Sequence, residues 1–221
     1  MRKRIILISG FARSGKDTLA NALRQRIGMH KTKVFKFATP LRQSLHQALA
    51  AVGLGTVDLW TEEPTLKAQL RPLMVEFGRF CRAQDKDVFV KATHGLIADD
   101  FRNGLEVAII ADCRYLNEAQ LTRKVGQEAG LEVQRVNIRT HGVQAANLEE
   151  MTSMAALDDG DAADYDASFE MGDIQSIERA ADHLAGKGKS PHAELLDANI
   201  EVRLLLERMD ARLKRLEVDR G

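Results

Sequence analysis

The sequence predicts an α/β fold with a parallel five-stranded sheet, helices on both faces and a C-terminal amphipathic helix. Strand patterns and helical patterns alternate along the chain, and a strand, a crossover helix and a further strand imply parallel pairing with right-handed connections. The strand patterns cover residues 5–8, 33–38, 107–111, 131–138 and 165–171, and the main helical patterns cover 19–27, 41–52, 66–82, 88–101 and 174–184. At 221 residues the chain suits one such domain with an appendage.

The most informative stretch is residues 5–18. Ile5 to Ile8 form a buried strand pattern, and Gly10 and Gly15 then frame a loop that ends in Lys16. This G-x-x-x-x-G-K spacing between a strand and a helix is that of a P-loop NTPase. Small residues let consecutive backbone N–H groups point into one concavity, and the helix start adds further unpaired N–H groups, so the loop suits a phosphate chain. Lys16 would reach the β- and γ-phosphates of a bound nucleotide.

Two carboxylates are candidate Mg²⁺ ligands. Asp17 stands where Ser or Thr usually follows the lysine, with Thr18 next to it, and the sequence leaves open which of the two serves the metal. The apolar strand 107–111 ends on Asp112, the Walker-B pattern, in which a carboxylate meets the Mg²⁺ shell at the carboxyl edge of the sheet.

Arginines beyond the loop are candidate phosphate ligands. Arg114 directly follows this strand and is either a surface charge or a transition-state clamp, of which we favour the clamp. A guanidinium matches phosphate oxygens in a bidentate manner. The other candidates are Arg13, Arg42, Arg79 and Arg139. Asn117 is a candidate cap for the helix that runs to Val125.

Residues 142–164 are polar and acidic, and we interpret them as a solvated mobile segment suited to a lid. Residues 53–66 read as a loop, which contains Trp60. Lys+Arg and Asp+Glu both total 32, which argues against a general nucleic-acid binder. Cys81 and Cys113 have no metal-ligand or redox spacing. No apolar run approaches the roughly 18 residues of a membrane span, so we expect a cytoplasmic protein.

The C-terminal part differs from the rest. Residues 1–186 make up the P-loop domain, 187–194 are a linker by composition, and 195–218 have heptad-like spacing. Two interpretations stay open for this helix: homo-oligomer formation through 195–216, or packing back on its own domain.

Four segments together resemble the bacteriophage-type deoxynucleoside monophosphate kinases. The stretch Ser9 to Thr18 resembles their R-S-G-K-D-T loop, and the stretch Asp112 to Glu118 (D-C-R-Y-L-N-E) resembles their D-V-R-F-P-N-E signature. Residues 37–42 and 77–91 resemble two further segments, and 166–184 resemble the last strand and helix, so the likeness spans about residues 4–185. The departures, among them Thr39 for Asp and Leu116 for Pro, lie mostly around the acceptor site.

The resemblance implies transfer of the ATP γ-phosphoryl group to a deoxynucleoside monophosphate, with Mg²⁺ and with a lid around 140–160. It implies catalytic roles for Lys16, Arg13, Arg79 and Arg114. The implied ATP-binding residues are Gly10, Arg13, Ser14, Gly15, Lys16, Asp17 and Thr18. The implied acceptor-binding residues are Arg42, Arg79, Arg114 and Glu118, and the implied metal ligands are Asp17 and Asp112. The alternatives are another small-molecule kinase, similar to phosphomevalonate or dephospho-CoA kinase, and an ATP-dependent assembly or switch protein acting through the C-terminal helix.

Overall fold

The computed structural model describes residues 3–61 and 63–187. Within them five strands form one parallel sheet in the order β2-β3-β1-β4-β5. The strands are β1 (Arg4–Ser9), β2 (Thr32–Phe35), β3 (Val107–Cys113), β4 (Glu132–Thr140) and β5 (Tyr165–Phe169). The predicted fold class is confirmed in this part of the chain. The heptad region 195–218 and nearly all of the linker lie outside the described residues.

The central strands β1 and β3 are buried on both faces, which explains their continuous apolar runs. Ile6 pairs with Ile109 of β3 on one side and with Gln134 of β4 on the other. Because all strands are parallel, the loop after β1, the end of β3 and the end of β4 meet at one edge of the sheet.

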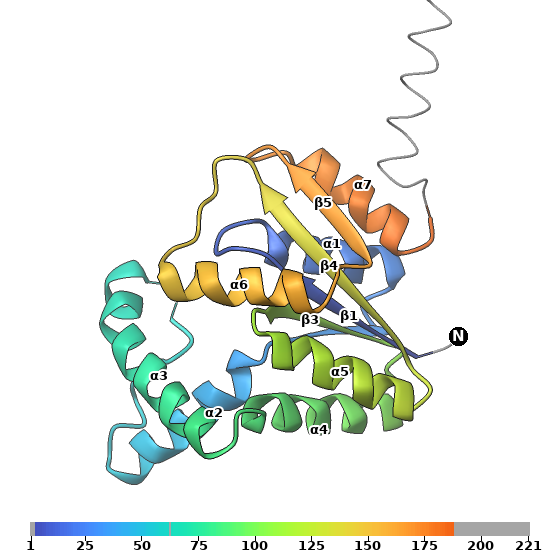
Figure 1. Cartoon of the computed structure of the whole chain (residues 1–221). Helices are drawn as coiled ribbons and strands as arrows, with labels where there is room; N and C mark the ends of the chain where they lie inside the picture. The colour runs from blue at the N-terminus through green and yellow to red at the C-terminus, as the bar shows by residue number, and fades with distance from the viewer. Residues whose placement is uncertain (1–2, 62, 188–221) are drawn as a thin grey trace, which may run out of the picture.

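Helices cover both faces of the sheet (Figure 1). On one face, α1 (Lys16–Ile27) and α7 (Ile174–Leu184) pack on β1, β3, β4 and β5 through residues such as Leu19, Leu23 and Ile177. On the other face lie α4 (Val88–Arg102), α5 (Leu116–Glu128) and α6 (Leu148–Gly160). Ile97 and Leu157 belong to the core of this second face.

Two helices project from the rest of the described domain. They are α2 (Ala38–Ala51) and α3 (Pro64–Gln84), at the left of Figure 1. Glu63 caps α3 by accepting from the N–H groups of Thr65 and Leu66, 2.8 and 2.6 Å away. Gly78 is the single buried residue of this helix. Trp60 lies in the connection before α3, edge-on to the ring of His46.

Three local predictions are corrected. The mobile segment predicted at 142–164 was wrong, because residues 148–160 form α6, with Met154 and Leu157 buried. Asn117 does not cap α5: the N-cap is Tyr115, and the Asn117 amide donates to the Lys86 carbonyl and the Asp87 carboxylate. The helices α1 and α2 begin three residues earlier than predicted, because their first residues, Lys16-Asp17-Thr18 and Ala38-Thr39-Pro40, have no long apolar side chain that would extend the helical period.

None of the helices in the described ranges is long and apolar enough to cross a lipid bilayer.

Candidate active site

The loop between β1 and α1 has the backbone of a phosphate-binding loop. Gly10, Arg13 and Gly15 all have positive φ angles, of 141°, 66° and 86°. Glycine is needed at position 10, since a Cβ there would lie 2.4 Å from the carbonyl oxygen of Ile138. The strand β4 thus packs directly beneath the loop and fixes its shape.

Lys16 is folded into the loop that it closes. Its Nζ donates to the carbonyls of Gly10 and Phe11, at 2.8 and 2.5 Å. Burial, aided by the positive charge of Arg114, lowers the pKa of Lys16 to about 8. The buried Ser14 hydroxyl has no hydrogen-bond partner among the described residues. A cation and a spare hydroxyl inside one concave loop are what an incoming phosphate requires.

The two predicted metal ligands lie in different environments. Asp17 is mostly exposed, and its carboxylate pairs with Lys36 at 2.7 Å. Both oxygens of Asp112 accept backbone N–H groups at the start of α2, from Phe37 at 2.7 Å and Ala38 at 3.0 Å. Burial raises the pKa of Asp112, although these hydrogen bonds and the charges of Arg114 and Lys36 oppose the shift. Asp112 therefore links β3 to α2.

No cluster of three or more metal-ligating side chains occurs in residues 3–61 and 63–187. The residues present fit a Mg²⁺ ion that takes most of its ligands from phosphates and water. Of the two carboxylates, Asp17 is the one open to such an ion, once Lys36 releases it.

The turn between β3 and α5 brings Arg114 to the phosphate loop. The carboxylate of Glu118 accepts the N–H groups of Arg114 and Tyr115, at 2.7 and 3.0 Å, and thereby fixes the turn. Burial, aided by the charge of Asp112, raises the pKa of Glu118 to about 8. The predicted acceptor-binding role of Glu118 stays a prediction, since its contacts here are with the backbone. The Arg114 side chain is exposed, and its charge acts on both Lys16 and Asp112.

Three other predicted arginines lie in the loop itself and on the helices α2 and α3. Arg79 is two-thirds exposed and pairs with Glu76 at 2.7 Å, so none of its contacts with described residues involves the phosphate loop. Its neighbour Arg82, one turn further along α3, instead stacks over the ring of Tyr115 at 5.0 Å and that of Phe89 at 5.3 Å. Arg13 is exposed in the loop, and Arg42 is half-buried on α2.

The predicted lid region contributes a carboxylate to the loop. Glu150, in the first turn of α6, is buried and accepts the N–H of Ala12 at 2.8 Å. The other end of α6 is held by Arg135 of β4, which is 1% exposed and pairs with Asp158 and Asp161. The helix therefore rests on the sheet and on the loop at the same time.

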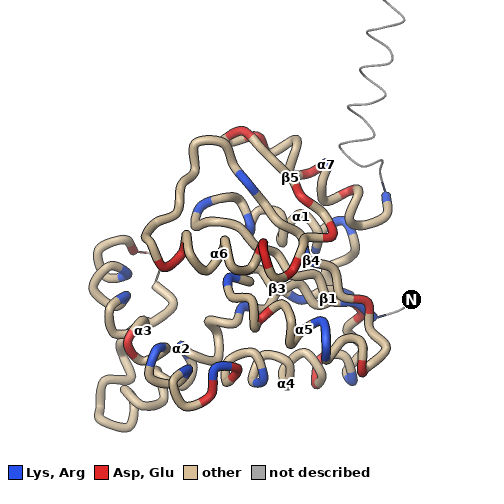
Figure 2. Tube along the Cα trace, viewed as in Figure 1, with Lys and Arg blue, Asp and Glu red and all other residues tan. Residues whose placement is uncertain are grey.

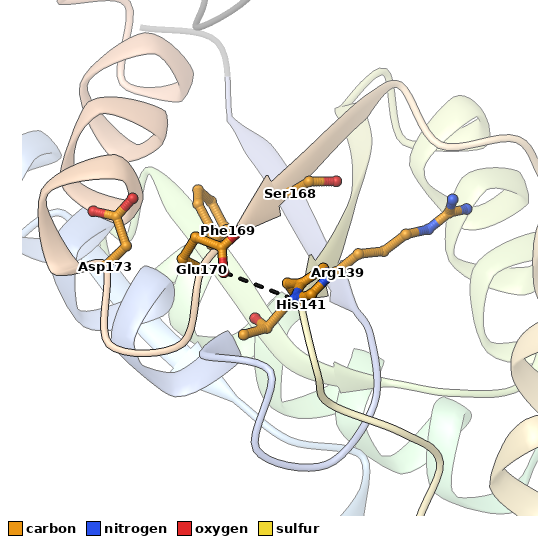
Figure 3. Close-up of a pocket in the computed structure, with 7 residues that line it drawn as sticks. Arg139, His141, Ser168, Phe169, Glu170 and Asp173 are labelled. Carbon is orange, nitrogen blue, oxygen red and sulfur yellow. Dashed lines mark ion pairs between the residues drawn. The ribbon is translucent and has the colours of Figure 1, made fainter.

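A pocket of about 370 Å³ opens beside the phosphate loop, at the carboxyl ends of β4 and β5 (Figure 3). Its lining includes Arg139, His141, Phe169 and Asp173. The pocket adjoins the loop because Thr140, which also lines it, donates its hydroxyl to the Ser14 carbonyl at 3.0 Å. Figure 3 marks the ion pair between His141 and Glu170, which are 3.8 Å apart.

Sequence reasoning missed three residues of this site. Arg82 is three residues from the predicted Arg79, so both lie on similar sides of the helix and the apolar pattern does not show which of them contacts the turn at Tyr115. Glu150 was detectable, because Asn147 followed three residues later by Glu is a capping pattern that starts a helix. Lys36 could not be predicted from the sequence, since its contact with Asp17 joins the segment after β2 to the first turn of α1.

A parallel sheet with a phosphate loop at its carboxyl edge, and further cationic side chains across from that loop, define a P-loop kinase. A comparison with protein-family models identifies the family. The model of the phosphomevalonate kinase family matches residues 8–127, more than half of the chain. The chain therefore belongs to the phosphomevalonate kinase family.

Solved structures provide more distant likenesses. An APS kinase from Mycobacterium tuberculosis, in complex with AMPPNP and APS, is 16% identical, with 84% of this chain and 97% of that chain covered and a TM-score of 0.42. A gluconokinase from Sinorhizobium meliloti is 13% identical, with 83% and 94% covered and a TM-score of 0.43. A sugar kinase from Janibacter is 12% identical, with 85% and 99% covered and a TM-score of 0.46. No curated protein matches the sequence.

Proposed function

We propose that the protein transfers the γ-phosphoryl group of ATP to a nucleoside monophosphate, with deoxynucleotides as the first candidates. The observation that carries the proposal is the position of Arg114. Its charge acts on Lys16 and Asp112 across from the phosphate loop, and Arg82 approaches the same turn from α3. A second cationic region opposite a phosphate loop suits an acceptor phosphate, which a nucleotide switch would not need.

On the donor side, the triphosphate would lie in the loop 10–15, with Lys16 leaving the carbonyls of Gly10 and Phe11 for the phosphate oxygens. The nucleoside would occupy the pocket between the ends of β4 and β5. Mg²⁺ would be held by Asp17 and the phosphates, and when bound it would neutralise charge on the transferred group.

Phosphoryl transfer requires positioning and charge neutralisation rather than covalent catalysis. Lys16 would neutralise the donor phosphates, and Arg114 would stabilise the oxygens of the group in transfer. Arg82 would act beside Tyr115 on the acceptor side. The oxygen of the acceptor phosphate attacks the γ-phosphorus, the bond to the β-phosphate oxygen breaks, and ADP leaves.

Phosphomevalonate is the second candidate acceptor, because the family match covers residues 8–127. The two acceptors share a phosphate monoester and differ in the rest of the molecule. The signature at 112–118 favours the nucleotide by resemblance, and the family match favours phosphomevalonate. Both use the same phosphate-binding residues.

The test is an ADP-release assay with ATP, Mg²⁺ and a panel of dNMPs, NMPs and phosphomevalonate. We expect ADP release that depends on one or more dNMPs. Release with phosphomevalonate alone would select the second candidate. ATP hydrolysis that no acceptor stimulates would refute both.

Variants test the assigned roles. Lys16→Ala should abolish transfer while the fold persists, as judged by circular dichroism. Arg114→Ala should lower kcat by about a hundredfold or more and change ATP affinity little, because the clamp acts in the transition state. The exposed Arg102→Ala, which loses only a surface pair with Asp99, is the matched control. Equal losses of kcat and ATP affinity in Arg114→Ala would contradict a role of Arg114 in stabilising the transition state.

A further inference from the structure

The first turn of α6 contacts both sides of the candidate site through two adjacent carboxylates. Glu150 is 7% exposed, and its two oxygens accept the N–H groups of Ala12 at 2.8 Å and of Ala146 at 2.6 Å. Glu149 accepts the hydroxyl of Tyr115 at 2.9 Å. Ala12 belongs to the phosphate loop, and Tyr115 follows Arg114 in the opposite turn. This end of α6 is marked in red in Figure 2.

These contacts are not needed to begin the helix. Asn147 already caps α6 by accepting the N–H of Glu150 at 2.8 Å. Both carboxylates instead take hydrogen bonds from outside the helix, and one of them does so from a buried position. Burying a carboxylate is costly unless it is hydrogen-bonded, so the Ala12 contact fixes the relative positions of helix and loop.

The rest of α6 is held firmly. Near its C-terminal end, Asp158 accepts from the buried Arg135 at 3.1 Å. Gly160 packs so closely on α5 that a Cβ there would lie 2.6 Å from methyl carbons of Leu116. A helix fixed in this way moves as one body, so a shift at its first turn reaches α5.

We propose that Glu149 and Glu150 couple the donor and acceptor sites of the kinase. Glu150 positions Ala12 in the donor loop, and Glu149 positions Tyr115, the ring over which Arg82 stacks. The inference rests on the proposed function, which assigns the two sites. Both glutamates are positioning residues, because neither contacts the phosphate-binding side chains Lys16 or Arg114 by hydrogen bond or ion pair within the described part of the chain.

Two substitutions separate the two halves of the coupling. In Glu150→Gln, one oxygen becomes an NH₂ group, so the side chain cannot accept from both Ala12 and Ala146. Tyr115→Phe keeps the ring beneath Arg82 and removes the hydroxyl that Glu149 accepts. Asp159→Asn, an exposed charge removal on the same helix, is the matched control.

The experiment is hydrogen–deuterium exchange of the full chain with and without Mg²⁺ and AMPPNP. In the wild type and in Asp159→Asn, we expect the nucleotide to slow exchange at loop amides 13–16 and at turn amides 114–116. In Glu150→Gln and Tyr115→Phe, the loop should still be protected, while the response at 114–116 falls about tenfold, as for loss of one hydrogen bond to a charged group.

Two results would overturn the proposal: a wild type whose turn amides ignore AMPPNP, or variants whose turn amides respond as the wild type does. Because Tyr115→Phe removes a single exposed hydroxyl contact, it gives an answer even if Glu150→Gln fails to fold. No acceptor is used, so failure of the acceptor panel refutes the proposed function and leaves this test intact.

Discussion

Substituting Arg135 with methionine should destabilise the domain by about 3 kcal/mol. The guanidinium is 1% exposed and donates to the Ser9 hydroxyl at 3.0 Å, to Asp158 at 3.1 Å and to the Asp161 carbonyl. Removing one partner of a buried ion pair costs about 3–5 kcal/mol, because the remaining charge is left uncompensated. We expect a cost at the lower end of this range, since Asp161 retains its ion pair with Arg123 at 2.6 Å and the Asp158 side chain is one-third exposed.

Thermal and urea unfolding followed by circular dichroism measure this effect. For a domain of this size, about 3 kcal/mol corresponds to a melting temperature lowered by roughly 6–12 °C. Arg135→Met combined with Asp158→Asn should recover part of the loss, because the carboxylate that loses its buried partner is then neutral. Among the described residues, only the exposed Arg139, 3.5 Å from Asp158, would otherwise compensate it. Arg79→Met is the control, since both members of its pair with Glu76 are about two-thirds exposed and such pairs contribute about 0–1 kcal/mol. An Arg135→Met variant within 1 kcal/mol of the wild type would refute the reasoning.

Three further predictions concern single positions. Gly10→Ala should destabilise the fold by more than about 1 kcal/mol and weaken ATP binding, measured by calorimetry, because its Cβ would collide with the Ile138 carbonyl. Gly95→Ala, on the exposed face of α4 with no atom near the new Cβ, should stabilise the domain by about 0.5–1 kcal/mol in urea unfolding. The pKa of Glu118 is about 8 in the folded state, against 4.5 for an ordinary glutamate. Between these two pH values the folded state binds more protons than the unfolded state, so the stability of the domain falls as pH rises through this range. Glu118→Gln mimics the protonated side chain, so its stability should match that of the wild type below pH 4.5 and exceed it at pH 8. Parallel curves of stability against pH would contradict this.

Local patterns were sufficient for the sheet and the phosphate loop. A strand buried on both faces needs consecutive apolar residues, and β1 and β3 have them. A phosphate loop needs glycine where φ is positive, and Gly10 and Gly15 stand there. Such requirements are set by the backbone within a few residues, so they can be read from the chain alone.

Side-chain partners far apart in the sequence could not be predicted in the same way. Arg135 is in phase with Leu131 and Val133, where alternation predicts an apolar side chain. It is tolerated there because it pairs with Asp158 in α6 and with Asp161, the residue after that helix. The contact of Arg82 with Tyr115 could not be predicted either, because the orientation of α3 decides whether Arg79 or Arg82 reaches that ring.

The sequence by itself determined a parallel α/β sheet, its phosphate loop with Lys16, and the strand that ends at Asp112. The tertiary structure alone decided that α6 is an ordered helix, that Glu150 contacts the loop, and that Asp112 holds the start of α2. The physical reason is the distance along the chain over which each feature is determined. Backbone periodicity and loop geometry depend on a few neighbouring residues, whereas the partner of a buried charge depends on how separate elements pack.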